Sequence, residues 1–317
     1  MKAVVRTKYG GPSVLAVKEI ERPVPMDDEV LIKVYATTVN RSDYHALTGK
    51  PFIMRFFTGL FRPKLRVTGS DFVGKVESVG RNVKLFKVGD KVMGFIDMGS
   101  QSHAEYLAIA EYKVTAAPSS LPYDQIPACL EGAFYALSGV QSIKPLAGQR
   151  GLVLGATGAI GTSYVQLLKH YQVEVTAVCE KIHSDLITSL GAIKIVDYKT
   201  DDFTRLNDRF DFVVDAVGKY SFSQCKHLLK DKGKFTSSQP NLFDLFTTWL
   251  GKGKKVLFAF PRNLITNLAF LNSLAESGSF KPVIDRKYTL EQIAEAYTYV
   301  GSGQKVGNVI ITISSGD

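Results

Sequence analysis

The sequence predicts an α/β protein in which a strand-rich, barrel-like part precedes a doubly wound parallel sheet. Its 317 residues suit two domains of ~150 residues, each long enough to bury a core. Strand patterns dominate the first third of the chain. After Pro118, strand and helix candidates alternate, which is typical of parallel strands joined by crossover helices.

The first part contains segments rich in β-branched residues and separated by glycine, proline, aspartate or asparagine. These segments read KAVVR, VLAVKEI, EVLIKVYATTV, VGKVESVG, DKVMGFI and AEYLAIA. Helical periodicity is short here and occurs chiefly in RSDYHALTG. We therefore expect a barrel-like domain with little helix.

The second part begins with helical spacing in LPYDQIPACLEGAFYALSGVQSI. Strand and helix candidates then follow in the order GLVLGA, AIGTSYVQLLKHY, VEVTAV, HSDLITSLG, IKIVDY, DFVVDAVG, SFSQCKHLLK and GKFTSS. Two further helices, NLITNLAFLNSLAESG and LEQIAEAYTYVGSG, precede a last strand, GNVIITI. A final strand of this kind is expected to return to the first domain.

Composition excludes several classes of protein. Apolar residues make up 45% and charged residues 22%, as in ordinary globular proteins. No apolar run approaches the ~18 residues of a membrane span, and the N-terminus lacks the apolar region of a secretory signal. Cys129, Cys179 and Cys225 are odd in number and widely spaced, which favours a reducing, cytoplasmic location. The net charge of +9 is spread along the chain without a nucleic-acid-binding motif, so no nucleic-acid partner is expected.

A glycine-rich turn follows the first strand of the alternating part. Such a turn can let the backbone approach a pyrophosphate at a helix N-terminus, or it can serve close packing alone. Its place at the first strand of the alternating run favours dinucleotide binding. The candidate residues of the turn are Gly155, Ala156, Thr157, Gly158, Ala159, Ile160 and Gly161.

The next strand ends where this kind of fold contacts the ribose of its cofactor. Glu180 at this point could bind the ribose hydroxyls of NAD, whereas Lys181 could bind the additional phosphate of NADP. A solvated charged pair that opens the next helix is an alternative. Tyr198 of IKIVDY and Val217 of DFVVDAVG complete the candidate cofactor-binding residues.

Nearly the whole chain resembles the medium-chain dehydrogenase/reductase superfamily, in particular its zinc-independent, quinone-oxidoreductase-like, NADP-dependent branch. The resemblance lies in the order and spacing of GGPSVLAVKEIERPVP, EVLIKVYATTVNRSDYHALTG, GSDFVGKVESVG, FKVGDKVMGF, HAEYLAI, GATGAIG, SLGAIKIVDY, DFVVDAVG and QKVGNVIITI. It implies a GroES-like β-barrel catalytic domain over residues 1–122 and 262–317. A Rossmann dinucleotide-binding domain would occupy residues 123–261.

The resemblance also implies an activity, namely hydride transfer from NADPH, with NADH as an alternative, to a quinone, an enone or a related reactive carbonyl. An NAD(P)-dependent alcohol dehydrogenase and a non-catalytic dinucleotide sensor are the alternatives. The expected substrate is a hydrophobic small molecule, and the expected assembly is a homodimer formed through the Rossmann domains.

Zinc-dependent relatives carry metal ligands at positions that differ here. Asn40 stands at the first ligand position, Gly69-Ser70-Asp71 replaces the glycine–histidine–glutamate motif, and Cys129 has no partner ligands. We therefore predict an enzyme without zinc or another metal.

Reduction without a metal needs hydrogen bonds to the developing oxyanion. The resemblance places Asn40 in the substrate pocket, where its amide could donate to a carbonyl oxygen. Tyr44 and His45 are the candidate proton donors, although ordinary packing on a helix face would explain both equally well. Asp43 is expected to accept backbone N–H bonds at the start of a helix.

Two segments, 51–66 and 241–260, mix aromatic and basic residues. They could form the wall or lid of an apolar pocket, a dimer surface, or an amphipathic contact with a membrane.

Overall fold

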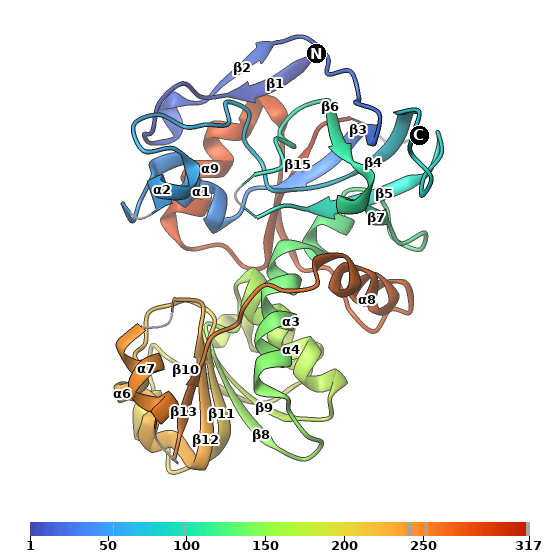
Figure 1. Cartoon of the computed structure of the whole chain (residues 1–317). Helices are drawn as coiled ribbons and strands as arrows, with labels where there is room; N and C mark the ends of the chain where they lie inside the picture. The colour runs from blue at the N-terminus through green and yellow to red at the C-terminus, as the bar shows by residue number, and fades with distance from the viewer. Residues whose placement is uncertain (53, 98, 240–241, 251–252, 315–317) are drawn as a thin grey trace. The chain divides into compact units, whose positions relative to one another are not determined.

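The computed structural model describes residues 1–52, 54–97, 99–239, 242–250 and 253–314. The chain forms two compact units, shown in Figure 1. Unit 1 comprises Met1–Glu131, Ile265–Gly278 and Pro282–Asp317, and unit 2 comprises Gly132–Leu264 and Ser279–Lys281. Unit 1 thus extends past the expected boundary at residue 122, because the 3₁₀ turn Ile126–Cys129 packs on strands of the first domain.

Unit 1 is built on a mixed sheet with strand order β14-β15-β3-β4-β5-β7, in which β6 also pairs with β3, β14 and β15 are parallel, and the other pairs are antiparallel. Its strands are β3 (Glu29–Thr38), β4 (Asp71–Val79), β5 (Lys91–Phe95), β6 (Tyr106–Ala110), β7 (Thr115–Ala116), β14 (Ile284–Thr289) and β15 (Asn308–Thr312). A separate hairpin pairs β1 (Lys2–Val5) with β2 (Ala16–Glu19). The last strand, β15, runs antiparallel to β3, so the C-terminal segment returns to the first domain as predicted.

The helices of unit 1 are α1 (Arg41–Thr48), α2 (Met54–Thr58), α8 (Leu264–Glu276) and α9 (Ile293–Ser302). Helix α1 starts at a capping box, in which the Asn40 side chain accepts from the Asp43 backbone and the Asp43 carboxylate accepts from the Asn40 N–H. It ends at Gly49, whose left-handed backbone (φ 62°) suits glycine. Short polar residues therefore fix where this helix begins and ends.

Unit 2 is a parallel six-stranded sheet with the order β10-β9-β8-β11-β12-β13. Its strands are β8 (Arg150–Leu154), β9 (Glu174–Cys179), β10 (Ala192–Asp197), β11 (Phe210–Asp215), β12 (Leu229–Ser237) and β13 (Lys255–Leu257). In chain order this is 3-2-1-4-5-6, the Rossmann arrangement. The α/β class and the doubly wound sheet are confirmed.

The helices of unit 2 are α3 (Glu131–Ile143), α4 (Ala159–His170), α5 (Ser184–Leu190), α6 (Phe222–Cys225) and α7 (Leu242–Leu250). Figure 1 shows α4 beside β8 and β9, and α7 beside β13. Two predicted helices are shorter than expected. Pro127 lies in the 3₁₀ turn, so α3 begins only at Glu131, and α6 stops because Leu228 and Leu229 turn into the core.

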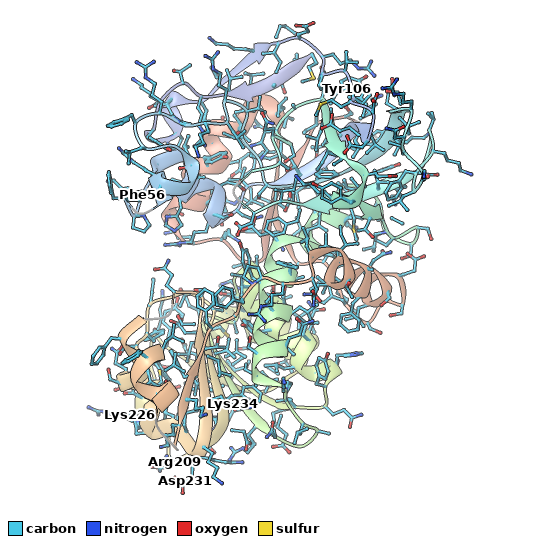
Figure 2. The ribbon with its side chains drawn as sticks, viewed as in Figure 1. Phe56, Tyr106, Arg209, Lys226, Asp231 and Lys234 are labelled. Atoms are coloured by element: carbon cyan, nitrogen blue, oxygen red, sulfur yellow. The ribbon has the colours of Figure 1, made fainter. Side chains whose placement is uncertain are left out.

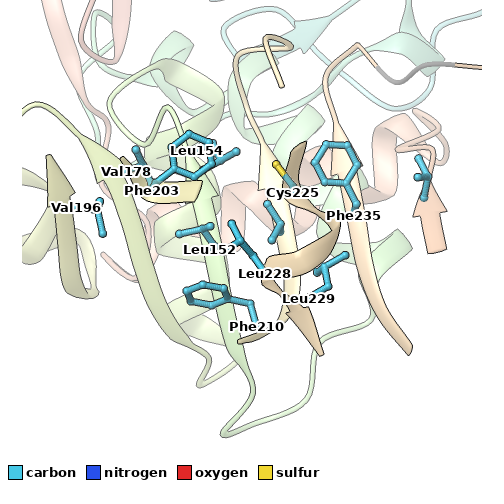
Figure 3. Packing of buried hydrophobic residues seen from close by; sticks show 12 residues of the cluster. Leu152, Leu154, Val178, Val196, Phe203, Phe210, Cys225, Leu228, Leu229 and Phe235 are labelled. Atoms are coloured by element: carbon cyan, nitrogen blue, oxygen red, sulfur yellow. The ribbon is translucent and has the colours of Figure 1, made fainter. Parts of the chain in front are cut away.

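The core of unit 2 joins side chains from several neighbouring strands (Figure 3). Leu152 and Leu154 from β8 meet Phe210 from β11 and Phe235 from β12, and all four are almost fully buried. Because helices cover both faces of a parallel sheet, its inner strands β8, β9 and β11 are mostly buried, whereas β12 has exposed charged residues near its start. Among the described residues, no helix is long and apolar enough to cross a membrane.

Candidate active site

The glycine-rich turn lies between β8 and α4, at the point where the strand order of the sheet reverses. Gly155 has a left-handed backbone (φ 72°), and Gly158 is the N-cap of α4 without a side-chain cap. The first backbone N–H groups of α4 therefore have no capping side chain and lie at the positive end of the helix dipole. This arrangement fits the pyrophosphate of a dinucleotide.

The glycines of the turn have different roles. A Cβ at Gly161 would lie 2.1 Å from the Gly155 carbonyl oxygen, so glycine is needed for close packing of the helix on the strand. A Cβ at Gly158 would meet only that same oxygen, at 4.0 Å. Packing within the protein therefore does not explain the glycine at position 158. A residue without a side chain would instead let a phosphate approach the backbone closely.

The loop after β11 supports this turn. The buried Asp215 carboxylate accepts hydrogen bonds from the N–H groups of Val217, Gly218 and Tyr220, at 2.9–3.1 Å. Val217 then lies against Gly155, where it would be 2.4 Å from an added Cβ. Val217 thus lies beside the turn, and its predicted role in cofactor binding stays a prediction, whereas Asp215 was not singled out in the sequence.

The ends of β9 and β10 bring Glu180 and Tyr198 together. The Tyr198 hydroxyl donates to Glu180 at 2.5 Å, and the Lys199 ammonium lies 3.2 Å from the same carboxylate. Both donors lower the pKa of the half-buried Glu180, and the hydrogen bond from Tyr198 is the larger cause. Lys181 is exposed and forms no ion pair with a described residue. Glu180 and Lys181, the acidic and basic candidates for contact with the ribose, therefore lie next to each other at the end of β9.

A cluster of buried polar side chains forms in unit 1 at the start of α1. The Asn40 amide donates to Thr38 Oγ1 at 2.5 Å, to Glu131 Oε2 at 2.9 Å and to Asp71 Oδ2 at 3.3 Å. Both amide hydrogens thus have acceptors within the protein. This differs from the predicted donation of Asn40 to a substrate carbonyl, which would require one of these bonds to be given up.

Glu131 is the centre of this cluster. Its Oε1 accepts from the Ser42 hydroxyl at 2.5 Å, and its Oε2 accepts from the Ser70 hydroxyl at 2.8 Å as well as from Asn40. Glu131 lies 91 residues from Asn40 in the chain, so no local spacing could reveal the contact. Glu131, which the structure places at the start of α3, was not singled out in the sequence.

Three buried carboxyl groups lie close together in this cluster. Burial is the main reason that the pKa of Glu131 rises to about 7, and the nearby charge of Asp71 adds to it. Burial likewise raises the pKa of Asp71 to about 6, against the opposing effect of hydrogen bonds from Thr38. The pKa of Asp43 is raised by burial and then by Glu131. Protons are therefore held in this cluster close to neutral pH.

A small cavity borders the cluster. It measures about 20 Å³ and is lined by Arg6, Ser42, Asp43, Ser70 and Tyr297, among other residues. Its volume is roughly that needed for one water molecule. The buried Tyr297 hydroxyl, which has no hydrogen-bond partner among the described residues, and the Asp43 carboxyl both lie at this cavity.

The other two predicted catalytic residues lie on α1. The Tyr44 ring is half-buried against Gly301 of α9, where it joins an apolar cluster. The Nε2 atom of His45 is buried without a hydrogen-bond partner among the described residues. Burial, followed by the charge of Arg41, lowers the pKa of His45. Packing thus explains the position of Tyr44, and the proton-donor roles of both residues stay predictions.

The residues at the expected metal positions do not fit zinc. Asn40 and Ser70 both donate hydrogen bonds to Glu131, and burial raises the pKa of the Cys129 thiol to about 12. Zinc binds thiolate sulfur and needs at least three protein ligands. Within the described ranges, no group of three or more histidine, cysteine, aspartate or glutamate side chains is arranged to hold a metal ion.

Replacing Gly161 tests the packing of the turn. We expect Gly161→Ala to destabilise the protein by about 1–3 kcal/mol, because the cost of overpacking outweighs the ~1 kcal/mol that alanine gains in a helix. Gly158→Ala is the matched control, with an expected cost below about 1 kcal/mol, since the added Cβ has space. Urea unfolding of both variants measures this. Equal stabilities would contradict the packing role of Gly161.

Glu131 makes the stability of the protein depend on pH. Its pKa in the folded state lies above the ordinary glutamate value, so folding is favoured while the carboxyl is protonated and loses this contribution as pH rises towards about 7. Glu131→Gln can keep the bonds to Asn40 and Ser70 and remain uncharged. We expect it to be more stable than the wild type at pH 8 by about 1–3 kcal/mol, and nearly equal at pH 5.

Thermal unfolding at both pH values measures this difference. The control is Glu77→Gln, which removes an exposed carboxylate paired with Arg22 and should change little at either pH. A Glu131→Gln variant that is destabilised at pH 8 would show that Glu131 is needed in its charged form.

Comparison with known proteins identifies the family. Residues 26–136 match the "Alcohol dehydrogenase GroES-like domain" family, and residues 190–311 match "Zinc-binding dehydrogenase". The 2-methylene-furan-3-one reductase of Solanum lycopersicum is 32% identical over 98% of this chain and 79% of its own length. The chloroplastic NADPH-dependent alkenal/one oxidoreductase of Arabidopsis thaliana is 31% identical with the same coverage.

A solved structure agrees in fold. The quinone oxidoreductase from Coxiella burnetii superposes with a TM-score of 0.89 at 24% identity and covers 99% of both chains. Together with the sequence relatives, this establishes the kinship over nearly the full length of the chain. The protein therefore belongs to the medium-chain dehydrogenase/reductase superfamily and is an oxidoreductase of its quinone-oxidoreductase-like branch.

Proposed function

We propose that the protein transfers hydride from NADPH to a quinone, an enone or a related reactive carbonyl without zinc. The observation that carries the proposal is the open, uncapped glycine turn at the reversal of strand order in unit 2. Relatives named as an alkenal/one oxidoreductase and a 2-methylene-furan-3-one reductase support the substrate class.

The bound nicotinamide cofactor supplies the hydride, and the chain supplies binding and orientation. In unit 2, the backbone of the turn holds the pyrophosphate. Lys181 and Lys199 are the cations that would accept the additional phosphate of NADP, while Glu180 is held by Tyr198. In unit 1, the Glu131 carboxyl holds a proton near neutral pH, and Asn40 and Ser70 fix the orientation of its Oε2 atom.

Reduction without a metal is part of the proposal because the side chains at the zinc positions of relatives are hydrogen-bond donors here. Acceptors that delocalise negative charge suit such a site, since they need less stabilisation of one oxyanion. A homodimer and a cytoplasmic location stay predictions. The three cysteines are buried and free, as a reducing compartment allows.

The activity can be measured directly. We expect the chelator-treated protein to oxidise NADPH in the presence of an ortho-quinone or an aryl enone, and Gly158→Ala to bind NADPH more weakly while it stays folded. Loss of turnover on chelation would contradict reduction without metal. Tight NADPH binding without reduction of either acceptor would favour the non-catalytic sensor.

Cofactor preference depends on the cations at the ends of β9 and β10. We expect Lys181→Ala to raise KM for NADPH roughly tenfold, because one charge-assisted hydrogen bond is lost, and to leave KM for NADH nearly unchanged. Lys226→Ala is the control, since it removes an exposed lysine at α6, away from β9. Faster turnover of the wild type with NADH would instead assign the ribose to Glu180 and favour NAD.

A further inference from the structure

One stretch of unit 1 is strongly cationic. Residues 44–70 contain no aspartate or glutamate, but they contain Lys50, Arg55, Arg62, Lys64 and Arg66. Lys50, Arg62, Lys64 and Arg66 are exposed, and among the described residues none of the five forms an ion pair. The stretch therefore presents positive charge to solvent, and no ion pair among the described residues neutralises it.

The same stretch exposes large apolar side chains. Phe52 is 60% exposed, Phe56 63%, Leu60 41% and Phe61 86%. Figure 2 shows Phe56, which belongs to α2, at the outer edge of unit 1. Single exposed apolar residues are normal on a protein surface, but several within ten residues form a patch that indicates an interaction.

The backbone under this patch is held in place. The Tyr9 hydroxyl donates to the Gly59 carbonyl at 2.5 Å and lies 2.7 Å from Thr58 Oγ1, and the Lys64 N–H donates to the Thr58 carbonyl at 2.8 Å. The Arg55 guanidinium lies over the Tyr9 ring, 4.7 Å from its centroid. The exposed side chains thus project from an anchored segment.

From these observations we infer that the exposed residues of the segment 50–66, here called the Phe–Arg patch, bind an anionic lipid surface. Every exposed residue described in this segment is either apolar or cationic. Phenylalanine and leucine side chains can enter the interface between headgroups and acyl chains, while lysine and arginine interact with anionic headgroups. The inference does not depend on the proposed reductase activity.

The composition of the patch favours lipid over other anionic partners. A nucleic acid or an acidic peptide is usually recognised with polar side chains that supply directional hydrogen bonds. The exposed part of the segment 50–66 has no serine, threonine, asparagine or glutamine. A lipid surface needs only apolar area and positive charge, and both are present.

Vesicle flotation with the full-length protein tests the inference. We expect the wild type to float with phosphatidylcholine–phosphatidylserine vesicles, to float less with pure phosphatidylcholine vesicles, and to be released by high salt. The double variant Phe56→Ser/Phe61→Ser and the triple variant Arg62→Glu/Lys64→Glu/Arg66→Glu should each weaken binding by at least about tenfold. Circular dichroism and thermal unfolding check that both variants stay folded.

The chain offers a matched control elsewhere in unit 1. Leu85 and Val88 are exposed to 64% and 62%, and they lie beside the exposed Lys84 and Lys87. Leu85→Ser/Val88→Ser should leave flotation unchanged, because this neighbourhood includes the acidic residues Asp90 and Glu111.

Several outcomes would overturn the inference. One is that the wild-type protein does not float with anionic vesicles. Another is that either variant of the patch floats as well as the wild type. RNA could also be added as a competitor of the vesicles. If it displaced the protein only to the extent that vesicle binding depends on charge, the patch would be a general polyanion site. A change from dimer to monomer in Phe56→Ser/Phe61→Ser, seen by sedimentation velocity, would assign the patch to a second copy of the chain.

Discussion

The architecture of unit 1 depends on the buried carboxylate of Asp71. It accepts hydrogen bonds from the Thr38 N–H at 2.8 Å and the Thr38 hydroxyl at 2.6 Å, and further bonds from Thr37 and Asn40. These bonds join the end of β3 to the start of β4, where α1 begins. His103 reinforces the junction, since its Nε2–H donates to the Thr38 carbonyl at 2.8 Å while Nδ1 accepts from Thr68. Burial lowers the pKa of His103 to about 4, which keeps the ring neutral.

This junction also explains why the cluster differs from a metal site. Several hydrogen-bond donors surround the Asp71 carboxylate, so it needs only one amide hydrogen from Asn40. The Asn40 amide also donates to Glu131. Glu131 then takes two further donors, Ser42 and Ser70. A metal ion would compete with these hydrogens for the same oxygens. The cluster therefore holds protons close to neutral pH, because burial raises the pKa of both Glu131 and Asp71.

The two parts of the molecule were not equally predictable from sequence. The parallel sheet could be predicted because strand and helix patterns alternate along the chain, and the glycine turn because Gly155 and Gly161 satisfy local steric demands. The capping role of Asp43 was also local, and the structure confirms it. Glu131 and Asp215 could not be found in this way, since their partners are brought to them only by the fold. For the same reason the full occupation of the Asn40 amide was invisible in the motif that contains it.

The buried carboxyl groups of unit 1 affect the net charge of the folded protein. Acidic groups gather inside unit 1, where burial favours their protonated forms, so they contribute less negative charge than the sequence suggests. The formal charge of +9 assumes that every carboxyl is ionised. Each proton held by Asp43, Asp71 or Glu131 makes the folded protein more positive than this value. The net charge of the folded chain therefore becomes more positive as pH falls through the range in which the cluster titrates.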